Sequence, residues 1–455
     1  MSKTKSPFQF RLLIIEDQKR WCRDMAESLW DILGTDSARY WYDWAEDATE
    51  AKEKVASNHY HFISIDQNIP ERPGELVMSE IGQSLWERFA KTQRFSFRIV
   101  YTAYGETALG DDAVRTGKAE YWHKSMTGRT HRERAIYSAD GWAERIGEIL
   151  DREYIGHALR QAGEFLPPGM ARIAGQIAES CRVGDKPDFE VPPEKEAIYL
   201  KDCLVLWDLA LHLAWVQAIA LNQEPYARTG MTVENSENPA VREADLLRLL
   251  PEIAKKDWLG AWAKYIGPGD PETREGAGGR FLEQASGPLR QLRDRLSNTF
   301  TFGSLQKEVQ ASCDSLLALL DALAFWADNP LFTHVRRQEE QEGWWLAETL
   351  RGGEQITREP IEFEVRVPAG MADIQENDVC IHWRGPEGEP LLVNLSPFVT
   401  VQIDESTRQP VLWLISHHRD GIWYRRSLGD GAIYPWEGIG EEEREVLEAA
   451  FGVEG

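Results

Sequence analysis

Acidic side chains follow two apolar runs of strand length near the start of the chain, and they are the residues best suited to chemistry. Residues 62–65 lead into Asp66, and residues 11–15 lead into Glu16 and Asp17. One acid at a strand end is more often a helix cap or a turn residue, so the interpretation depends on what converges there. Because the carboxyl ends of parallel strands meet at one edge of a sheet, these three carboxylates would share a pocket.

Two further strand-like runs end in groups that can bind phosphoryl oxygens. Residues 97–101 lead to the hydroxyl of Thr102, and residues 119–123 lead to the amine of Lys124. Three clustered carboxylates repel one another unless a cation joins them. Hard oxygen ligands without a nearby histidine or cysteine favour Mg²⁺. A hydroxyl and an amine opposite the cation would complete a site for a phosphoryl group.

The alternation of strands and helices predicts the fold that would position these side chains. Apolar residues recur at helical spacing in residues 21–33 and 79–92, and strand-like runs lie between such segments. This alternation implies a flavodoxin-like, doubly wound parallel sheet with right-handed crossovers. We expect this α/β domain to occupy residues 1–150.

The acids, the hydroxyl and the amine, at these positions and in this order, resemble the bacterial receiver domain of two-component response regulators. The resemblance covers residues from about 8 to 150. It implies that Asp66 is the phospho-acceptor and that a histidine kinase, or another phosphodonor, supplies the phosphoryl group. It also implies that Glu16, Asp17, the Asp66 carboxylate and the Asn68 carbonyl hold Mg²⁺.

The same resemblance assigns roles to residues on the later strands. It implies that Thr102 and Lys124 bind the phosphoryl oxygens, and that Tyr121 is the aromatic residue that turns inward on activation. Two departures from the family pattern are visible. Ser125 stands where the family usually has proline, and residues 71–76 make the loop after the acceptor strand longer than usual, so that this loop could cover the pocket.

Composition limits the possible functions of the whole chain. The 455 residues suggest two to four domains, and a net charge of −24 argues against nucleic acid as a partner. Five scattered cysteines without a paired motif are typical of a reducing compartment. With no apolar signal core and no uninterrupted membrane-spanning run expected, we predict a cytoplasmic protein without a membrane partner.

The remainder of the chain predicts two further domains, which makes the fold class multidomain α/β + α + β. Residues 151–340 have the periodicity of a helical bundle, and residues 341–455 that of a small antiparallel β domain with a C-terminal helix. These parts more weakly resemble degenerate HEPN-like helical modules and β modules of bacterial conflict and defence proteins. HEPN ribonucleases need a histidine about five residues after an arginine; here Asn298 follows Arg293, so a nuclease is not expected.

The combined interpretation is a response-regulator-like signalling protein. Asp66 would accept a phosphoryl group with Mg²⁺, and the switch would pass to the helical and β regions, which would bind a protein partner or form a homodimer. We expect no enzyme activity beyond self-phosphorylation and self-dephosphorylation of Asp66. The alternative is a receiver-fold scaffold of a bacterial defence or regulatory system that is never phosphorylated.

Overall fold

The computed structural model of the chain describes two compact units. The first unit comprises Met1–Ala158 and Arg182–Glu190, and the second comprises Leu159–Cys181 and Val191–Gly455. The described residues are 8–34, 39–102, 120–123, 139–181, 191–222, 235–254, 281–298, 305–338, 340, 344–352, 360–364, 374–384, 390–403 and 410–453.

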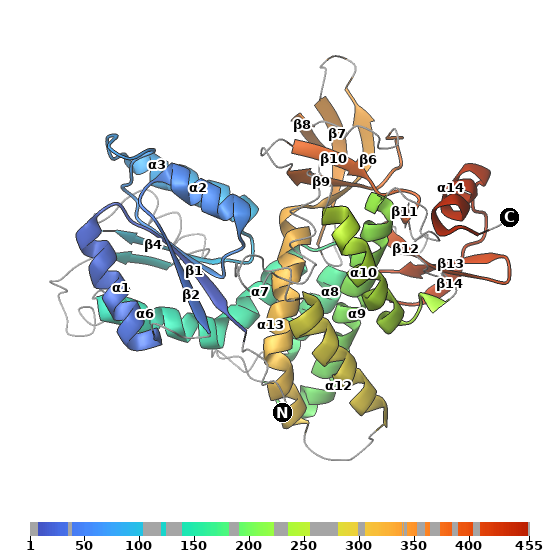
Figure 1. Cartoon of the computed structure of the whole chain (residues 1–455), viewed down its shortest axis with the longest axis horizontal. Coiled ribbons are helices and arrows are strands. Elements are labelled where there is room, and N and C mark those ends of the chain that lie inside the picture. Colours follow the sequence, from blue (N-terminus) through green and yellow to red (C-terminus); the bar gives the residue numbers. More distant parts are fainter. Residues whose placement is uncertain are drawn as a thin grey trace. The chain divides into compact units, whose positions relative to one another are not determined.

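The first unit is built on a five-stranded parallel sheet (Figure 1). Its strands are β1 (Phe10–Ile15), β2 (Tyr40–Ala45), β3 (Phe62–Ile65), β4 (Phe97–Thr102) and β5 (Glu120–His123). They pair in the order β2-β1-β3-β4-β5, and every pair is parallel. This order is that of the flavodoxin-like fold, which confirms the fold class predicted for the N-terminal part.

Helices cover both faces of this sheet. Helices α1 (Lys19–Leu33) and α6 (Ala139–Glu148) lie on one face, and α2 (Ala48–Ser57) and α3 (Ser79–Thr92) lie on the other (Figure 1). Because both faces are covered, β1 and β3 are buried along their whole length, as expected for central strands of a parallel sheet. The Asp47 side chain caps α2 by accepting a hydrogen bond from the Glu50 backbone, at 2.9 Å.

A run of helices follows α6 in the chain, and those after Ala158 belong to the second unit. These are α7 (Tyr154–Phe165), α8 (Met170–Ser180), α9 (Glu196–Asn222), α10 (Pro239–Ala254), α12 (Gly287–Asn298) and α13 (Gln306–Asp328), with short π-helical turns at Ile149–Glu153 and Phe281–Ser286 and a 3₁₀ turn at Pro193–Lys195. Helix α9 is buried on nearly every face, which explains its almost uninterrupted apolar sequence. The boundary between the two units falls within α7.

Two helices of the bundle are long and apolar enough to cross a membrane by length and composition alone. They are Pro193–Asn222 and Gln306–Asp328, and 78% of the apolar window of each is buried inside the structure. The sequence analysis, by contrast, expected no uninterrupted membrane-spanning run in the chain. Burial in the bundle accounts for the apolar composition of both helices, so the composition is weak support for a membrane span.

Two antiparallel sheets complete the second unit. The first has the order β10-β9-β6-β7-β8, and the second has the order β11-β12-β13-β14. The strands are β6 (Leu331–Arg337), β7 (Trp344–Leu350), β8 (Pro360–Glu364), β9 (Cys380–Arg384), β10 (Pro390–Asn394), β11 (Val399–Ile403), β12 (Pro410–Arg419), β13 (Ile422–Ser427) and β14 (Ile433–Pro435), and α14 (Glu441–Phe451) follows them.

Strand β6 differs from the sequence prediction. Its residues lie within the range predicted to form a helical bundle, 151–340, but they pair with β7. The side chains of Phe332 and Val335 are buried, and a register shift between Thr333 and Arg336 breaks the simple alternation. Because of this irregularity, the sequence lacks the regular alternation by which a strand is recognised. The predicted boundary between a helical and a β domain near residue 340 falls within the second unit and stays a prediction.

The start of α8 makes a close backbone contact that predicts a stability effect. Gly169 has φ +84°, and a Cβ atom there would lie 1.8 Å from the Leu428 carbonyl oxygen. We expect Gly169→Ala to lower the free energy of unfolding by about 3 kcal/mol, because it adds backbone strain and a steric overlap. Gly421→Ala, with a similar φ of +78° and open space around it, should cost only about 1 kcal/mol.

Urea denaturation of both variants, followed by tryptophan fluorescence, measures this difference. Equal losses for the two substitutions would show that the contact between Gly169 and Leu428 contributes nothing beyond backbone strain.

Candidate functional site

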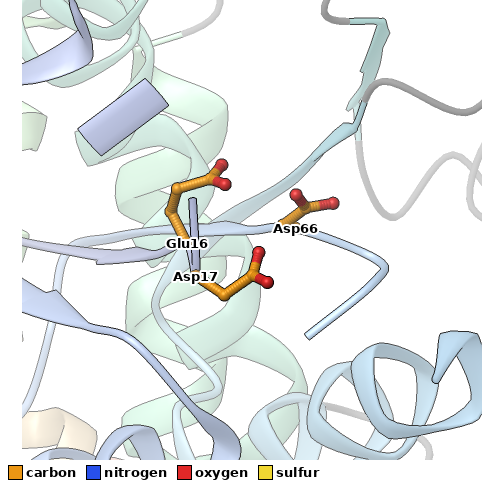
Figure 2. A group of neighbouring side chains, drawn as sticks. All are labelled: Glu16, Asp17 and Asp66. Carbon is orange, nitrogen blue, oxygen red and sulfur yellow. The ribbon is translucent and has the colours of Figure 1, made fainter. Parts of the chain in front are cut away.

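Three carboxylates meet at the carboxyl edge of the parallel sheet. Glu16 and Asp17 directly follow β1, and Asp66 directly follows β3. Strands β1 and β3 are hydrogen-bonded neighbours, with Ile15 aligned to Ile65, so the acids are brought side by side. One carboxylate oxygen from each side chain lies within 4.8 Å of the others. Figure 2 shows these three side chains, which we call the acidic cluster.

Backbone hydrogen bonds fix the acids in place. The Asp66 amide donates to the Ile15 carbonyl at 3.0 Å, and the Glu16 amide donates to the Ala45 carbonyl at 2.9 Å. The side chains also accept local hydrogen bonds. Glu16 Oε1 accepts from the Gln18 amide, and Asp66 Oδ1 accepts from the Asn68 amide, both at 3.2 Å. The parallel sheet therefore continues one residue past β1 and β3 and sets the spacing of the carboxylates.

The acidic cluster fits a divalent cation. Glu16 is 1% exposed and Asp66 is 3% exposed, while Asp17 is half-buried. Carboxylates withdrawn from water at such short separations repel strongly, and buried charges are normally paired or bound to a metal. The donors are all oxygen atoms, the type that Mg²⁺ prefers. Asn68, whose carbonyl is a further ligand only by the receiver resemblance, lies two residues beyond Asp66.

A buried tyrosine connects this edge of the sheet with the helices beside it. Tyr101 lies on β4, and its ring stacks on Trp142 of α6 at 5.6 Å and meets the edge of Trp21 of α1 at 6.5 Å. Burial, and secondarily the charge of Glu16, raise the pKa of Tyr101 above its usual range. The phenol therefore stays neutral and adds no further negative charge to the site.

The loop after the acceptor strand is tied to α2 at its base. The amides of Ala48 and Thr49 donate to the carbonyls of Pro70 and Glu71 at 3.0 and 3.1 Å, and an isolated bridge joins Ile69 to Met78. Residues 72–78 are exposed. These contacts hold the base of the loop to α2, and the prediction that the loop could cover the pocket stays a prediction.

Three predicted site residues can be placed only by their position in the chain. Thr102 is the last residue of β4, and Tyr121 lies within β5, which pairs with β4 in parallel. The side chains of these two residues, together with all of Lys124 and Ser125, lie outside the described part of the structure. Their roles stay predictions.

The structure gives Arg293, the residue considered for a nuclease, ordinary surroundings on α12. Its guanidinium pairs with the adjacent Asp294 at 3.1 Å and lies over the ring of Trp207, 5.7 Å from the ring centre. These contacts give it a packing role.

The sequence analysis missed a buried group of polar residues in the second unit. Asp208 of α9 contacts Arg242 of α10 and Arg426 of β13, and the charges of both arginines act on His212 of α9. The signal in the sequence was that Asp208 and His212 interrupt an apolar run one helical turn apart. Nothing in the sequence identified the two arginines as their neighbours.

Comparison with known proteins gives matches for the parallel-sheet fold alone. No family model matches the chain, and no curated protein matches it. The solved structures that are similar include a CheY-like response regulator receiver domain from Methanospirillum hungatei JF-1, at 18% identity and a TM-score of 0.24 over 31% of this chain and 94% of that one.

Other similar structures belong to the same class. A Francisella response regulator receiver domain is 19% identical, with a TM-score of 0.23, over 30% of this chain and 94% of that one. A Thermotoga maritima response regulator in complex with Mg²⁺ and BeF is 21% identical, with a TM-score of 0.22, over 31% of this chain and 99% of that one. These low TM-scores carry no weight for function, and no match supports the HEPN-like resemblance of the remainder.

The position of α3 predicts an effect of one methyl group beside the acidic cluster. A Cβ atom on Gly82 would lie 2.3 Å from the backbone oxygen of Gln67, the residue after Asp66. We expect Gly82→Ala to lower the free energy of unfolding by about 2–3 kcal/mol, because the helix and this loop must separate. Gly175→Ala, in α8 with no atom within 4 Å, should be neutral or raise stability by up to about 1 kcal/mol.

Both substitutions place alanine in a helix, so their difference in urea denaturation isolates the contact with Gln67. A neutral Gly82→Ala would mean that α3 does not determine the position of the loop.

Proposed function

We propose that the first unit binds Mg²⁺ and accepts a phosphoryl group on Asp66, as the receiver of a signalling protein. The observation that supports this most is the convergence of Glu16, Asp17 and Asp66 at the carboxyl edge of a sheet with the order β2-β1-β3-β4-β5. Open α/β sheets bind their ligands at this edge. An acceptor carboxylate here is next to two others that can hold the cation.

The proposed reaction forms an acyl phosphate. One carboxylate oxygen of Asp66 bonds to the phosphorus of the donor while the bond from phosphorus to the donor atom breaks. If the donor is a phosphohistidine, the imidazole nitrogen leaves with the bonding electrons and takes up a proton. Mg²⁺ would supply the positive charge that lets an anionic carboxylate approach an anionic phosphoryl group. Glu16 and Asp17 would hold that charge beside the acceptor.

The remaining site residues have supporting roles in this proposal. Thr102 is the last residue of β4, and Lys124 follows β5 in the sequence. A hydroxyl and an ammonium at these positions would hold phosphoryl oxygens. Tyr121 would repack when the site becomes phosphorylated. A conformational switch of this kind needs a free energy difference of only about 1–3 kcal/mol between its states.

The second unit would deliver the output of the switch. We propose that it binds a protein partner or a second copy of the chain, that the protein acts in the cytoplasm, and that its own chemistry is limited to self-phosphorylation and self-dephosphorylation of Asp66. The phosphodonor would be a histidine kinase or a small acyl phosphate.

Phosphorylation can be measured on the purified chain. Incubation with Mg²⁺ and a small acyl phosphate should add one phosphate per chain by intact-mass spectrometry, and Asp66→Ala should abolish it because the acceptor oxygen is gone. Asp31→Asn, an exposed carboxylate on α1, serves as the matched control and should be modified like the wild type. Absence of any modification of the wild type would favour the unphosphorylated scaffold.

Metal binding gives a separate test of the acidic cluster. We expect Asp17→Asn to weaken Mg²⁺ binding by about tenfold or more, because it removes one of the three converging carboxylates. Asp24→Asn, which removes a carboxylate paired with Arg20 on the surface of α1, should leave Mg²⁺ affinity unchanged. Isothermal titration calorimetry measures both. Equal Mg²⁺ affinities for the two variants would show that the cation binds outside the acidic cluster.

A further inference from the structure

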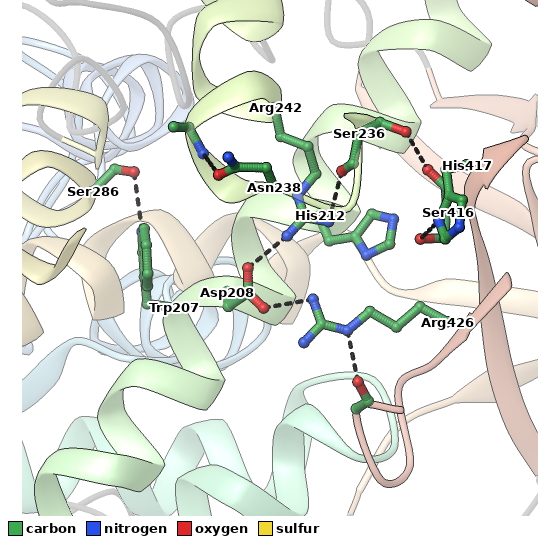
Figure 3. Close-up of polar contacts among 12 residues, drawn as sticks. Trp207, Asp208, His212, Ser236, Asn238, Arg242, Ser286, Ser416, His417 and Arg426 are labelled. Carbon is green, nitrogen blue, oxygen red and sulfur yellow. Dashed lines mark hydrogen bonds and ion pairs between the residues drawn. The ribbon is translucent and has the colours of Figure 1, made fainter. Parts of the chain in front are cut away.

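A buried charged group joins the helices of the second unit to its last sheet. Asp208 and His212 lie one turn apart on α9, and two arginines from other elements reach Asp208 (Figure 3). Arg242 Nη2 lies 2.6 Å from Asp208 Oδ1, and Arg426 Nη1 lies 2.6 Å from Asp208 Oδ2. We call these four residues the arginine cluster. One carboxylate is therefore shared between two guanidinium groups.

The charges of the arginine cluster do not cancel. The Arg242 side chain is fully buried, the Arg426 side chain is 9% exposed, and the single carboxylate of Asp208 neutralises only one of them. Glu237, whose charge also acts on Arg242, is paired with Arg419 through a contact of 2.7 Å. A net charge of about +1 thus remains in a region largely withdrawn from water, where an unbalanced charge is costly.

His212 adds no charge to this region. Its Nε2 lies 2.8 Å from the Ile415 carbonyl oxygen, which can only accept, so Nε2 carries the proton and Nδ1 is a free acceptor. Burial, followed by the charges of Arg242 and Arg426, lowers the pKa of His212 well below its usual range, so the ring is neutral. Burial also lowers the pKa of the neighbouring His417.

Two buried polar atoms of the cluster lack a partner within the part of the chain that the structure describes. These are the acceptor His212 Nδ1 and the donor Arg242 Nε. Other donors of Arg242 and Arg426 are used: Arg242 Nη1 bonds the Ser236 carbonyl at 3.1 Å, and Arg426 Nε bonds the Gly431 carbonyl at 2.9 Å. Buried polar groups are normally satisfied, so an unfilled donor and an unfilled acceptor in one cluster favour a ligand that can both accept and donate a hydrogen bond.

We propose that the arginine cluster is a binding site for a phosphoryl group that carries one negative charge, either dihydrogen phosphate or a singly protonated phosphate monoester. Its unprotonated oxygens would accept hydrogen bonds from the Arg242 and Arg426 guanidinium groups, and a P–OH group would donate to His212 Nδ1. Its single negative charge would balance the excess positive charge of the cluster. Access would be beside Asp208, whose side chain is 22% exposed.

The ligand chemistry follows from the donors and acceptors. A carboxylate would bring acceptors and charge but no proton for His212 Nδ1, and sulfate in ordinary buffers likewise carries no proton. A water molecule could form hydrogen bonds with both His212 Nδ1 and Arg242 Nε but would leave the positive charge unbalanced. Only a protonated oxyanion meets all three requirements, which separates it from these alternatives.

The test is calorimetric titration of the full chain with inorganic phosphate in slightly acidic buffer. The Asp66→Asn background and a chelator that removes divalent cations eliminate binding at the acidic cluster, so the result is independent of the proposed receiver function. We expect saturable phosphate binding in this background. Arg426→Gln should weaken it by about tenfold or more, because a desolvated charged contact is lost. Arg444→Gln, on the exposed face of α14, is the matched control and should leave phosphate affinity unchanged.

Two comparisons define the ligand. The affinity for sulfate should be lower than that for phosphate by about tenfold or more, because sulfate cannot donate a hydrogen bond to His212 Nδ1. Adenosine monophosphate binding more tightly than phosphate would identify a monoester as the occupant, and weaker binding would identify free phosphate; either supports the site.

Three outcomes would overturn the proposal: no phosphate binding by the Asp66→Asn chain, equal binding of sulfate and phosphate, or unchanged binding by Arg426→Gln. If circular dichroism shows that Arg426→Gln does not fold, Arg426→Lys replaces it. Lysine keeps the charge but not the planar pair of donors, so phosphate affinity should still fall.

Discussion

Repulsion among three carboxylates is the constraint on which the N-terminal unit depends. The pairing of β1 with β3 fixes Glu16, Asp17 and Asp66 at a common edge, and the covering helices keep two of them from water. Neither the sheet register nor the helix packing can relax without losing buried apolar surface. The acids therefore cannot move apart, and a cation is the simplest way to offset their mutual repulsion.

The interior of the second unit has the opposite imbalance. There two arginines share Asp208, and an excess positive charge lies inside a chain whose net charge is −24. Net charge therefore describes how the surface interacts with large polyanions but says nothing of individual interior sites. Both clusters share a physical feature: long-range packing holds side chains of like charge close together.

Local patterns in the sequence predicted the parts of the fold that depend on local physics. The parallel sheet, the end of α1 at Gly34 and the whole of α3 follow from apolar periodicity and a terminating glycine. The acidic cluster was also predictable, because parallel strands necessarily share an edge. The arginine cluster was not, because Arg242 and Arg426 meet Asp208 only through the packing of a helix and a sheet that are distant in the chain.

The hydrogen bonds from Ala48 and Thr49 to the loop separate its base from its tip. At the base, the carbonyls of Pro70 and Glu71 accept hydrogen bonds from the first amides of α2. At the tip, Gly74 has φ +83°, and a Cβ atom added there would have no atom within 4 Å. We therefore expect insertions at the tip to leave the end of β3 unchanged. The tip of the loop is accordingly a suitable position for inserting an epitope or a fluorescent reporter.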